Sequence, residues 1–188
     1  MSRAEKEENL RKAAKEGNVD TVRKLIAQGT NVNAADSDGT ASLHHAADGG
    51  HIGIFKLLLA AKANVNATNK EGVTPLHYSA KLGHLEVSRE LLNRGADINA
   101  VNEFGSTALM HAGNNGHSEL VAILLDKGAF LEAADKNGDT ALNLAASKGH
   151  SEVVTILLDK GAFLEAADKN GFTALMNAAY NGHSEVVT

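Results

Sequence analysis

Residues 69–101 read NKEGVTPLHYSAKLGHLEVSRELLNRGADINAV, and this stretch decides the fold. The segment NKEG is typical of a turn, because its glycine can take a positive φ. Thr74 followed by Pro75 predicts a helix start, with Thr as the cap and Pro in the first helical position. Since Gly83 predicts a helix end, we expect a short helix between these signals.

The second half of this stretch has the pattern of another short helix. Residues 85–93 place Val87, Leu91 and Leu92 on one face, and Gly95 predicts the end of the helix. Each of the two helices is too short to be stable alone in water. A pair of this size also cannot bury its own apolar face, so we expect it to stack on further copies.

Further copies recur at a fixed spacing of 33 residues. One glycine column is Gly39, Gly72, Gly105, Gly138 and Gly171, and a second column pairs glycine with histidine at Gly50-His51, Gly83-His84, Gly116-His117, Gly149-His150 and Gly182-His183. A third column holds Gly29, Lys62, Gly95, Gly128 and Gly161. The stretch ILLDKGAFLEAADKNG occurs unchanged at 123–138 and at 156–171, which indicates duplication of a whole repeat.

The segment TPLHYSAKLGHLEVSRELLNRGADIN, with its T-P-L-H helix start and its G-H loop, resembles an ankyrin repeat. The resemblance covers residues from about 5 to 188. It implies an all-α fold, a solenoid of stacked helix-turn-helix units with projecting β-turn fingers. The template divides the single array 1–188 into repeat 1, an N-terminal cap (5–35), repeat 2 (36–68), repeat 3 (69–101), repeat 4 (102–134), repeat 5 (135–167) and repeat 6, a truncated repeat (168–188). Because repeat 6 stops before its Leu pair, we expect the natural chain to continue past Thr188.

Composition and charge exclude several classes of protein. Apolar residues make up 43%, which is enough for a core, whereas the 4% of aromatic residues argues against one large aromatic-rich centre. The net charge is −5 and the chain after residue 34 is acidic, so nucleic acid is a poor partner. There is no cysteine, no apolar run long enough for a membrane helix and no secretory signal. We therefore expect a cytoplasmic monomer without membrane contact, a nuclear protein or a secreted effector remaining open.

The nine histidines raise the question of a metal or catalytic site. The resemblance implies structural roles for the five in the G-H loops, bonded to main chain at the loop, and for His44 and His77 at the T-P-L-H position. Equivalent residues of stacked repeats lie ~10 Å apart, too far for two imidazoles to share a zinc ion at ~2 Å each. No nucleophile–base arrangement or phosphate-binding glycine motif stands out. We expect no enzyme activity, no metal and no cofactor.

A modification is a further hypothesis from the resemblance. Ankyrin repeats in animals can be substrates of an asparaginyl hydroxylase that acts on segments such as GADIN. Asn33, Asn66 and Asn99 fit this pattern, whereas Glu132 and Glu165 replace the asparagine in later repeats. The alternative is that these asparagines hold the main chain of the fingers.

The positions that vary between repeats are candidates for binding. The resemblance places them beside the finger glycines and on the inward side of the first helices, on a concave face centred on repeats 2 to 4. The candidate partner-binding residues are Ser37, Asp38, Thr40, His45, Asp48, Lys70, Glu71, Val73, Tyr78, Lys81, Leu82, Glu103, Phe104, Ser106, His111, Asn114, Asn115, Lys136, Asn137, Asp139, Phe172 and Tyr180.

Aromatic residues are scarce, so their placement is informative. Tyr78, Phe104, Phe172 and Tyr180 fall on variable positions, where they are interface anchors or ordinary exposed rings. Two more aromatic residues occupy the column of Asn64 and Asp97, where their rings could instead pair between fingers. They are Phe130 and Phe163.

Departures from the repeat pattern concentrate early in the chain. Repeat 2 has Ala41-Ser42 in place of Thr-Pro, Lys62 in a glycine column and Gly53 within its second helix, and repeat 4 has Gly113 in its first helix. A side chain at a left-handed position, or a glycine inside a helix, costs on the order of 1 kcal/mol. We predict that repeats 2 to 4 open more readily in hydrogen exchange than repeats 5 and 6.

These observations favour a non-catalytic scaffold that binds another protein or an extended peptide. A second hypothesis is a regulatory or targeting arm of a larger enzyme, channel or effector protein, which the truncated repeat would suit. An engineered repeat protein is a third, against which the irregular repeats 2 and 4 argue. Because one fold hosts many functions, the sequence does not identify the partner.

Overall fold

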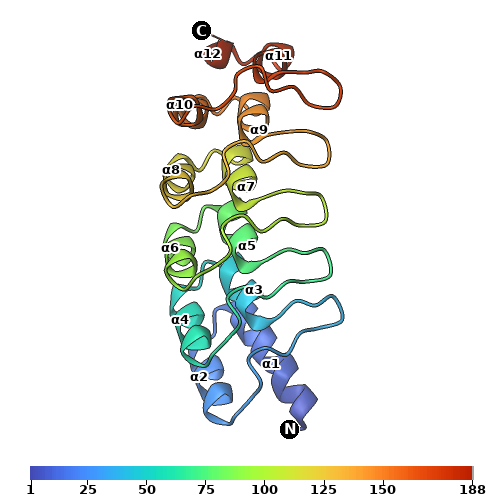
Figure 1. Cartoon of the computed structure of the whole chain (residues 1–188). Helices are drawn as coiled ribbons and strands as arrows, with labels where there is room; N and C mark the ends of the chain where they lie inside the picture. The colour runs from blue at the N-terminus through green and yellow to red at the C-terminus, as the bar shows by residue number, and fades with distance from the viewer. Residues whose placement is uncertain (188) are drawn as a thin grey trace. The chain divides into compact units, whose positions relative to one another are not determined.

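The regular elements of residues 1–187, which the computed structural model describes, are short helices arranged in pairs (Figure 1). The chain divides into two compact units. Unit 1 comprises residues 1–79 and 84–97, and unit 2 comprises residues 80–83 and the chain from residue 98 onward. The fold is therefore all-α, as predicted, with isolated β-bridges at Ala35–Ala41 and Ala167–Thr173.

The helices of unit 1 come from repeats 1 to 3. They are α1 (Arg3–Glu16), α2 (Val19–Ala27), α3 (Ser42–Asp48), α4 (Ile52–Ala60), the greater part of α5 (Pro75–Leu82), and α6 (Leu85–Asn93). Helix α1 packs against α2 and α3, and α4 packs against α2, α3 and α6. The second helices α2, α4 and α6 thus form one row, with first helices beside them (Figure 1).

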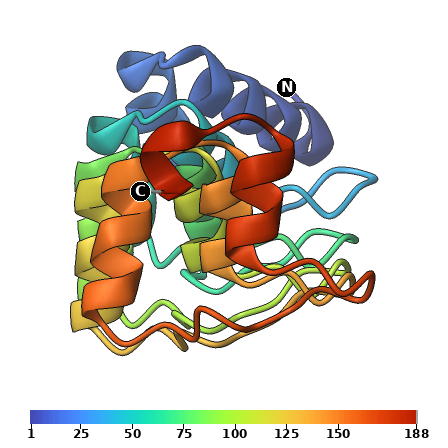
Figure 2. The same ribbon diagram turned by 90° about the horizontal axis from the view of Figure 1, so that it is seen from above.

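Unit 2 repeats this arrangement. Its helices are the end of α5, α7 (Ala108–Asn114), α8 (Ser118–Asp126), α9 (Ala141–Ser147), α10 (Ser151–Asp159), α11 (Ala174–Tyr180) and α12 (Ser184–Val187). Helix α9 packs between α7 and α11, and α10 packs against α8, α9 and α12. The loops that precede α9 and α11 project together beside the first helices, and these loops are the fingers (Figure 2).

Helix starts follow local capping chemistry. Helix α5 begins at Pro75, as the sequence predicts, and the hydroxyl of Thr74 accepts a bond from the main-chain N–H of His77. Helix α1 begins at Arg3, slightly before the expected start of repeat 1. There the hydroxyl of Ser2 accepts a bond from the N–H of Glu5, whose carboxylate accepts one from the N–H of Ser2. This capping box explains the earlier start.

Leucine and alanine columns form the core. The first leucine of each Leu pair is fully buried in its second helix, at Leu58, Leu91, Leu124 and Leu157. Small residues of the first helices are equally buried, at Ala46, Ser79, Ala112, Ala145 and Ala178. Close approach of neighbouring first helices requires these small side chains. On α11 the column of Leu142 is open to solvent, since Leu175 is 44% exposed where its equivalent Leu142 is 2% exposed, whereas Ala178 of the same helix stays buried.

Candidate functional site

The histidines of the G-H loops are joined to the preceding repeat. In each case ring atom Nε2 donates to a main-chain oxygen 36 residues earlier. The pairs are His51–Lys15 (3.2 Å), His84–Asp48 (2.8 Å), His117–Lys81 (3.1 Å), His150–Asn114 (3.1 Å) and His183–Ser147 (3.0 Å). The expected bond of these rings to main chain is present, and its acceptor lies at the end of the first helix of the preceding repeat. These bonds satisfy carbonyl groups at helix ends that would otherwise lack partners.

The T-P-L-H histidine holds the next finger. His44 is fully buried, and its Nε2 donates to the main-chain oxygens of Ala67 (3.0 Å) and Val73 (3.2 Å). Its Nδ1 accepts a bond from the N–H of Ala41, which defines the neutral tautomer. Burial lowers the pKa of His44, an effect that the hydrogen bonds to Ala67 and Val73 only partly oppose. Its role is therefore structural.

Asparagines of the GADIN-type segments also join neighbouring repeats. The side chain of Asn66 donates to the main-chain oxygen of Gly95 (3.2 Å) and accepts from the N–H of Asp97 (2.8 Å). Asn33 makes the same two bonds, to Lys62 (3.2 Å) and Asn64 (2.7 Å). These amides hold the loop that leads to the next finger, so their loss would cost hydrogen bonds as well as a side chain.

Each finger is a tight turn organised by one side chain. Oδ1 of Asn69 accepts bonds from the N–H groups of Glu71 (3.0 Å) and Val73 (2.9 Å), which places Lys70 and Glu71 at the tip. The N–H of Lys70 donates to the main-chain oxygen of Asp38 in the preceding finger (2.8 Å). The fingers of unit 1 are thus joined through main chain, and the side chains at their tips, such as Lys70 and Glu71, are exposed.

The residues predicted to bind a partner are all accessible to some degree. The exposed ones are Ser37, Asp38, Asp48, Lys70, Glu71, Lys81, Leu82, Glu103, Phe104, Asn115, Lys136, Asn137, Phe172 and Tyr180. The half-buried ones are Thr40, His45, Val73, Tyr78, Ser106, His111, Asn114 and Asp139. Accessibility permits binding without demonstrating it, so the binding roles of these residues stay predictions.

In unit 1 the structure gathers several of these residues around Tyr78. Its half-buried ring packs edge-on against His44, with ring centroids 6.0 Å apart. Burial raises the pKa of the Tyr78 hydroxyl, and the carboxylates of Asp48 and Glu71 raise it further. Tyr78 therefore lies among acidic side chains from a first helix and a finger.

His45 lies on the same side of unit 1. Burial lowers the pKa of its imidazole, and the ammonium group of Lys15 on α1 lowers it further. The carboxylates of Asp36 and Asp48 act in the opposite direction. This part of the surface consequently carries both charge signs within a short range, which suits recognition of a polar protein surface.

Unit 2 contributes three aromatic candidates, Phe104, Phe172 and Tyr180. The ring of Phe104 is 57% exposed at a finger tip, and its main-chain oxygen accepts a bond from the N–H of Lys136 in the next finger (2.9 Å). Phe172 and Tyr180 contact one another edge-on, with centroids 6.3 Å apart. Burial raises the pKa of the Asp139 carboxyl, and nearby Asp135 and Asp168 add to this.

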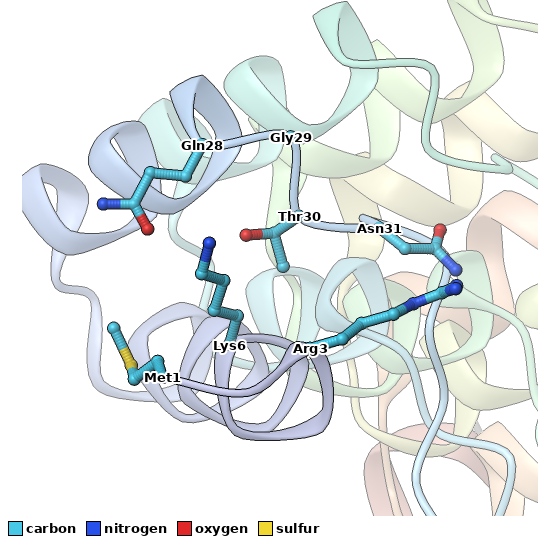
Figure 3. Close-up of a pocket in the computed structure, with 7 residues that line it drawn as sticks. All are labelled: Met1, Arg3, Lys6, Gln28, Gly29, Thr30 and Asn31. Atoms are coloured by element: carbon cyan, nitrogen blue, oxygen red, sulfur yellow. The ribbon is translucent and has the colours of Figure 1, made fainter.

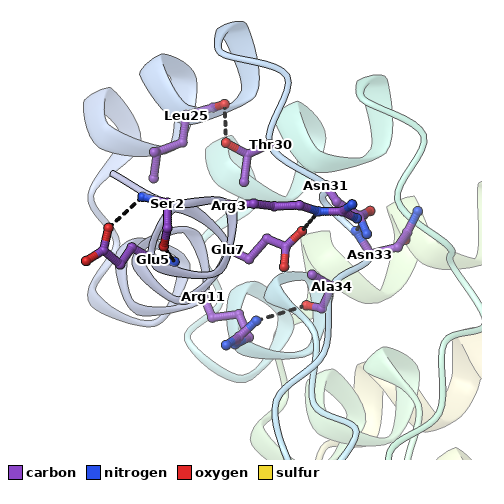
Figure 4. A network of polar contacts seen from close by, with 10 residues as sticks. All are labelled: Ser2, Arg3, Glu5, Glu7, Arg11, Leu25, Thr30, Asn31, Asn33 and Ala34. Atoms are coloured by element: carbon purple, nitrogen blue, oxygen red, sulfur yellow. Dashed lines mark hydrogen bonds and ion pairs between the residues drawn. The ribbon is translucent and has the colours of Figure 1, made fainter.

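Unit 1 also contains a hollow of about 340 Å³ between the start of α1 and the loop after α2. It is lined by Met1, Arg3, Lys6, Gln28, Gly29, Thr30 and Asn31 (Figure 3). Two of its polar groups have partners within the fold: the Arg3 guanidinium donates to Glu7 (2.9 Å) and the Thr30 hydroxyl to the main-chain oxygen of Leu25 (2.7 Å) (Figure 4). The lining contains no acid–base pair, so the hollow does not resemble a catalytic site.

Residues 1–187 contain no cluster of three or more His, Cys, Asp or Glu side chains that could hold a metal ion. Over the same range, none of the helices combines the length and apolar character needed to cross a membrane.

Two exposed residues were not among the predicted binding positions. Phe130 is 66% exposed and Phe163 is 67% exposed, more than Phe104 or Phe172. A signal was present in the sequence, because both replace polar residues in the column of Asn64 and Asp97. The repeat pattern identified that column but did not show that its side chains point outward.

Stacked helix pairs with projecting fingers define a class, the α-helical repeat proteins. A family model described as "Ankyrin repeats (3 copies)" matches residues 10–102, 95–168 and 130–188. The chain therefore belongs to the ankyrin repeat family, whose members are generally protein–protein interaction modules and typically non-catalytic. A search of curated proteins found no match to this chain.

Proposed function

We propose that this protein is a non-catalytic scaffold that binds another protein or an extended peptide through its fingers and first helices. The observation that carries the proposal is that side chains which recur from repeat to repeat hold the repeats together, whereas many of those that vary between repeats are exposed. Framework groups such as His84 and Asn66 are bonded to neighbouring repeats, whereas variable groups such as Glu71 and Phe104 are exposed. A rigid frame loses little main-chain conformational entropy when the side chains that it presents bind a partner.

In unit 1 we infer that Tyr78 is the main anchor. A half-buried aromatic ring offers apolar area while its position is already restricted by contact with His44. Asp48 and Glu71 would supply polar contacts around it. In unit 2 the corresponding anchor is Phe104, whose ring stands at a finger tip.

The test is capture of partners from cell extract by the full chain, with quantification by mass spectrometry. We expect Tyr78→Ala to reduce recovery of a specific partner by about tenfold or more, as loss of an aromatic anchor does. Tyr78→Phe keeps the ring and should bind nearly as the original protein does. Glu86→Ala, an exposed change on second helix α6, is the matched control.

The affinity of the purified partner is then measured by calorimetry for the same variants and for Phe104→Ala. Equal affinity for the original protein, Tyr78→Ala and Phe104→Ala would place the binding surface elsewhere. A thermal melt of each variant separates loss of binding from loss of folding.

A further inference from the structure

Phe130 and Phe163 form a repeated aromatic feature on unit 2, in the loops that lead to the finger turns at residues 135–139 and 168–172 but outside those turns and outside the first helices. Each follows a second helix, at equivalent positions of two adjacent repeats and within the duplicated stretch. The N–H of Phe130 donates to the side chain of Asn99 (2.7 Å), and that of Phe163 donates to the carboxylate of Glu132 (3.0 Å). The two main-chain positions are thus held in the same register by the preceding repeat.

The rings perform no evident local task in the fold. At the same column Asn31 and Asn64 accept bonds from the N–H groups of Asn33 and Asn66, both at 3.0 Å, which stabilises the turn. A phenylalanine cannot make this bond, and about two-thirds of each ring is exposed. Large aromatic rings in solvent gain substantially from burial against a partner, and they are enriched at interfaces.

Apolar and acidic side chains accompany the two rings in their loops. Leu164, which follows Phe163, is also exposed. Lys160 pairs with Asp126 across the two repeats, with Nζ 2.6 Å from Oδ1. In residues 126–140 and 159–173, which contain both rings, seven acidic side chains outnumber four lysines, and the acidic ones include Glu132, Asp159 and Glu165.

Charge and spacing together select the partner. An acidic excess is repelled by anionic lipid surfaces and attracts basic protein segments. Stacked helices lie ~10 Å apart. Residues seven apart on an α-helix are separated by about 10.5 Å along its axis and lie on nearly the same side. An amphipathic helix laid along the two loops can therefore direct one apolar side chain toward each phenylalanine.

We propose that Phe130, Phe163 and Leu164 form a docking surface for an amphipathic helix of another protein. That helix carries apolar residues seven positions apart, with lysine or arginine on the flanks that face Glu132, Asp159 and Glu165. This surface is separate from the finger and first-helix surface. A negative result for one of the two proposed binding surfaces therefore leaves the other proposal unaffected.

The test uses the full chain and a fluorescently labelled model helix with leucine at positions seven apart and lysine at the flanks. Fluorescence anisotropy gives the dissociation constant. The double variant Phe130→Asn with Phe163→Asn introduces the neutral residue that repeats 1 and 2 carry as Asn31 and Asn64, so the fold should tolerate it and the charge of the surface is unchanged. We expect this variant to bind at least about tenfold more weakly.

Phe104→Ala is the matched control, because it removes an exposed ring from a finger. Its affinity for the lysine peptide should equal that of the original protein. A second peptide, with every lysine replaced by glutamate, should bind at least about tenfold more weakly to the original protein. Equal affinity of the double variant, or of the glutamate peptide, overturns the proposal.

Two further measurements address other occupants. Sedimentation should show that the original protein does not self-associate through the two phenylalanines. Self-association that is lost in the double variant would make a second copy of this chain the occupant. Flotation with vesicles of phosphatidylcholine and phosphatidylserine should show no binding that depends on the two phenylalanines. Binding of that kind would indicate a membrane surface and refute a protein helix.

Discussion

Nε2 of His84 lies 2.8 Å from the main-chain oxygen of Asp48, and the same ring stands against the loop glycine of the preceding repeat. A Cβ atom added to Gly50 would lie 2.6 Å from Nδ1 of His84. The glycine column therefore has two physical causes: a positive φ of 64° at Gly50 and the space taken by the histidine of the next repeat.

Replacement of Gly50 by alanine should destabilise unit 1 by about 1–3 kcal/mol, because the new methyl group strains the left-handed backbone and collides with His84. Gly53→Ala is the matched control. Gly53 lies in α4 and its added Cβ would meet nothing within 4 Å, so alanine should stabilise by about 0.5–1 kcal/mol. Urea denaturation measures both, and equal stability of the two variants would contradict this explanation.

Replacement of Lys62 by glycine should stabilise the protein by about 1 kcal/mol. Lys62 has a φ of 64°, which is unfavourable for any side chain, and its equivalents in the other repeats are glycines. The main-chain oxygen that accepts from Asn33 is retained in the variant. Ala61→Gly, at a φ of −83°, should bring no such gain. Differential scanning calorimetry compares the two melting temperatures, and a lower value for Lys62→Gly would refute the prediction.

Acidification should destabilise unit 1 through His44. Burial lowers its pKa in the folded chain below the value of about 6.5 typical of an unfolded chain. The unfolded chain then binds the proton more readily. The stability contributed by neutral His44 is present above about pH 6.5 and is lost as the pH falls through the folded-state pKa.

The variant His44→Asn tests this dependence. Asn143 occupies the same column three repeats later, and its amide donates to the main-chain oxygens of Ala166 (3.2 Å) and Phe172 (3.3 Å), as His44 does to Ala67 and Val73. Urea midpoints at about pH 7.5 and about pH 5 should differ less for this variant than for the original protein. An unchanged difference would mean that other groups control the acid sensitivity.

Replacement of Glu132 by asparagine should stabilise unit 2 by about 0.5–1.5 kcal/mol. Glu132 accepts from the N–H of Phe163 but has no donor, whereas Asn99 in the same column also donates to the main-chain oxygen of Gly128. Asparagine would restore a donor toward the equivalent Gly161. Glu132→Gln, whose longer side chain suits this geometry less well, is the control. The free energy of unfolding of both variants is measured by chemical denaturation. An equal gain for Glu132→Gln and Glu132→Asn would mean that removal of the charge, and not the restored hydrogen bond, stabilises the protein.

Much of the local structure could be predicted from residues 69–101. Pro75 and Leu85 begin the two helices that the sequence indicated, because capping residues, proline and glycine act through local geometry. The positive φ of Lys62 likewise follows from its place in a glycine column. These features depend on neighbours in the chain, which the sequence displays directly.

The contacts between repeats were harder to predict. The acceptor of the His84 ring lies 36 residues away, and no local rule identifies Asp48 as its partner. The outward direction of Phe130 depends on how its loop is held by Asn99 in the preceding repeat. The sequence showed which residues occupy equivalent positions in the repeats. The direction in which a side chain such as that of Phe130 points depends on contacts with neighbouring repeats, which the sequence does not show.

The constant offset between a G-H histidine and its acceptor has a consequence for how such a chain can change in length. His150 bonds to Asn114 and His183 bonds to Ser147, each across 36 positions. If recombination between the duplicated segments removed residues 135–167, His183 would lie 36 positions after Asn114. It could then donate to the main-chain oxygen of Asn114, as His150 does now. Any gain or loss of a multiple of 33 residues within the array preserves this offset, whereas other changes of length between a ring and its acceptor alter it. Whole periods are therefore the lengths by which the array can grow or shrink with these bonds intact.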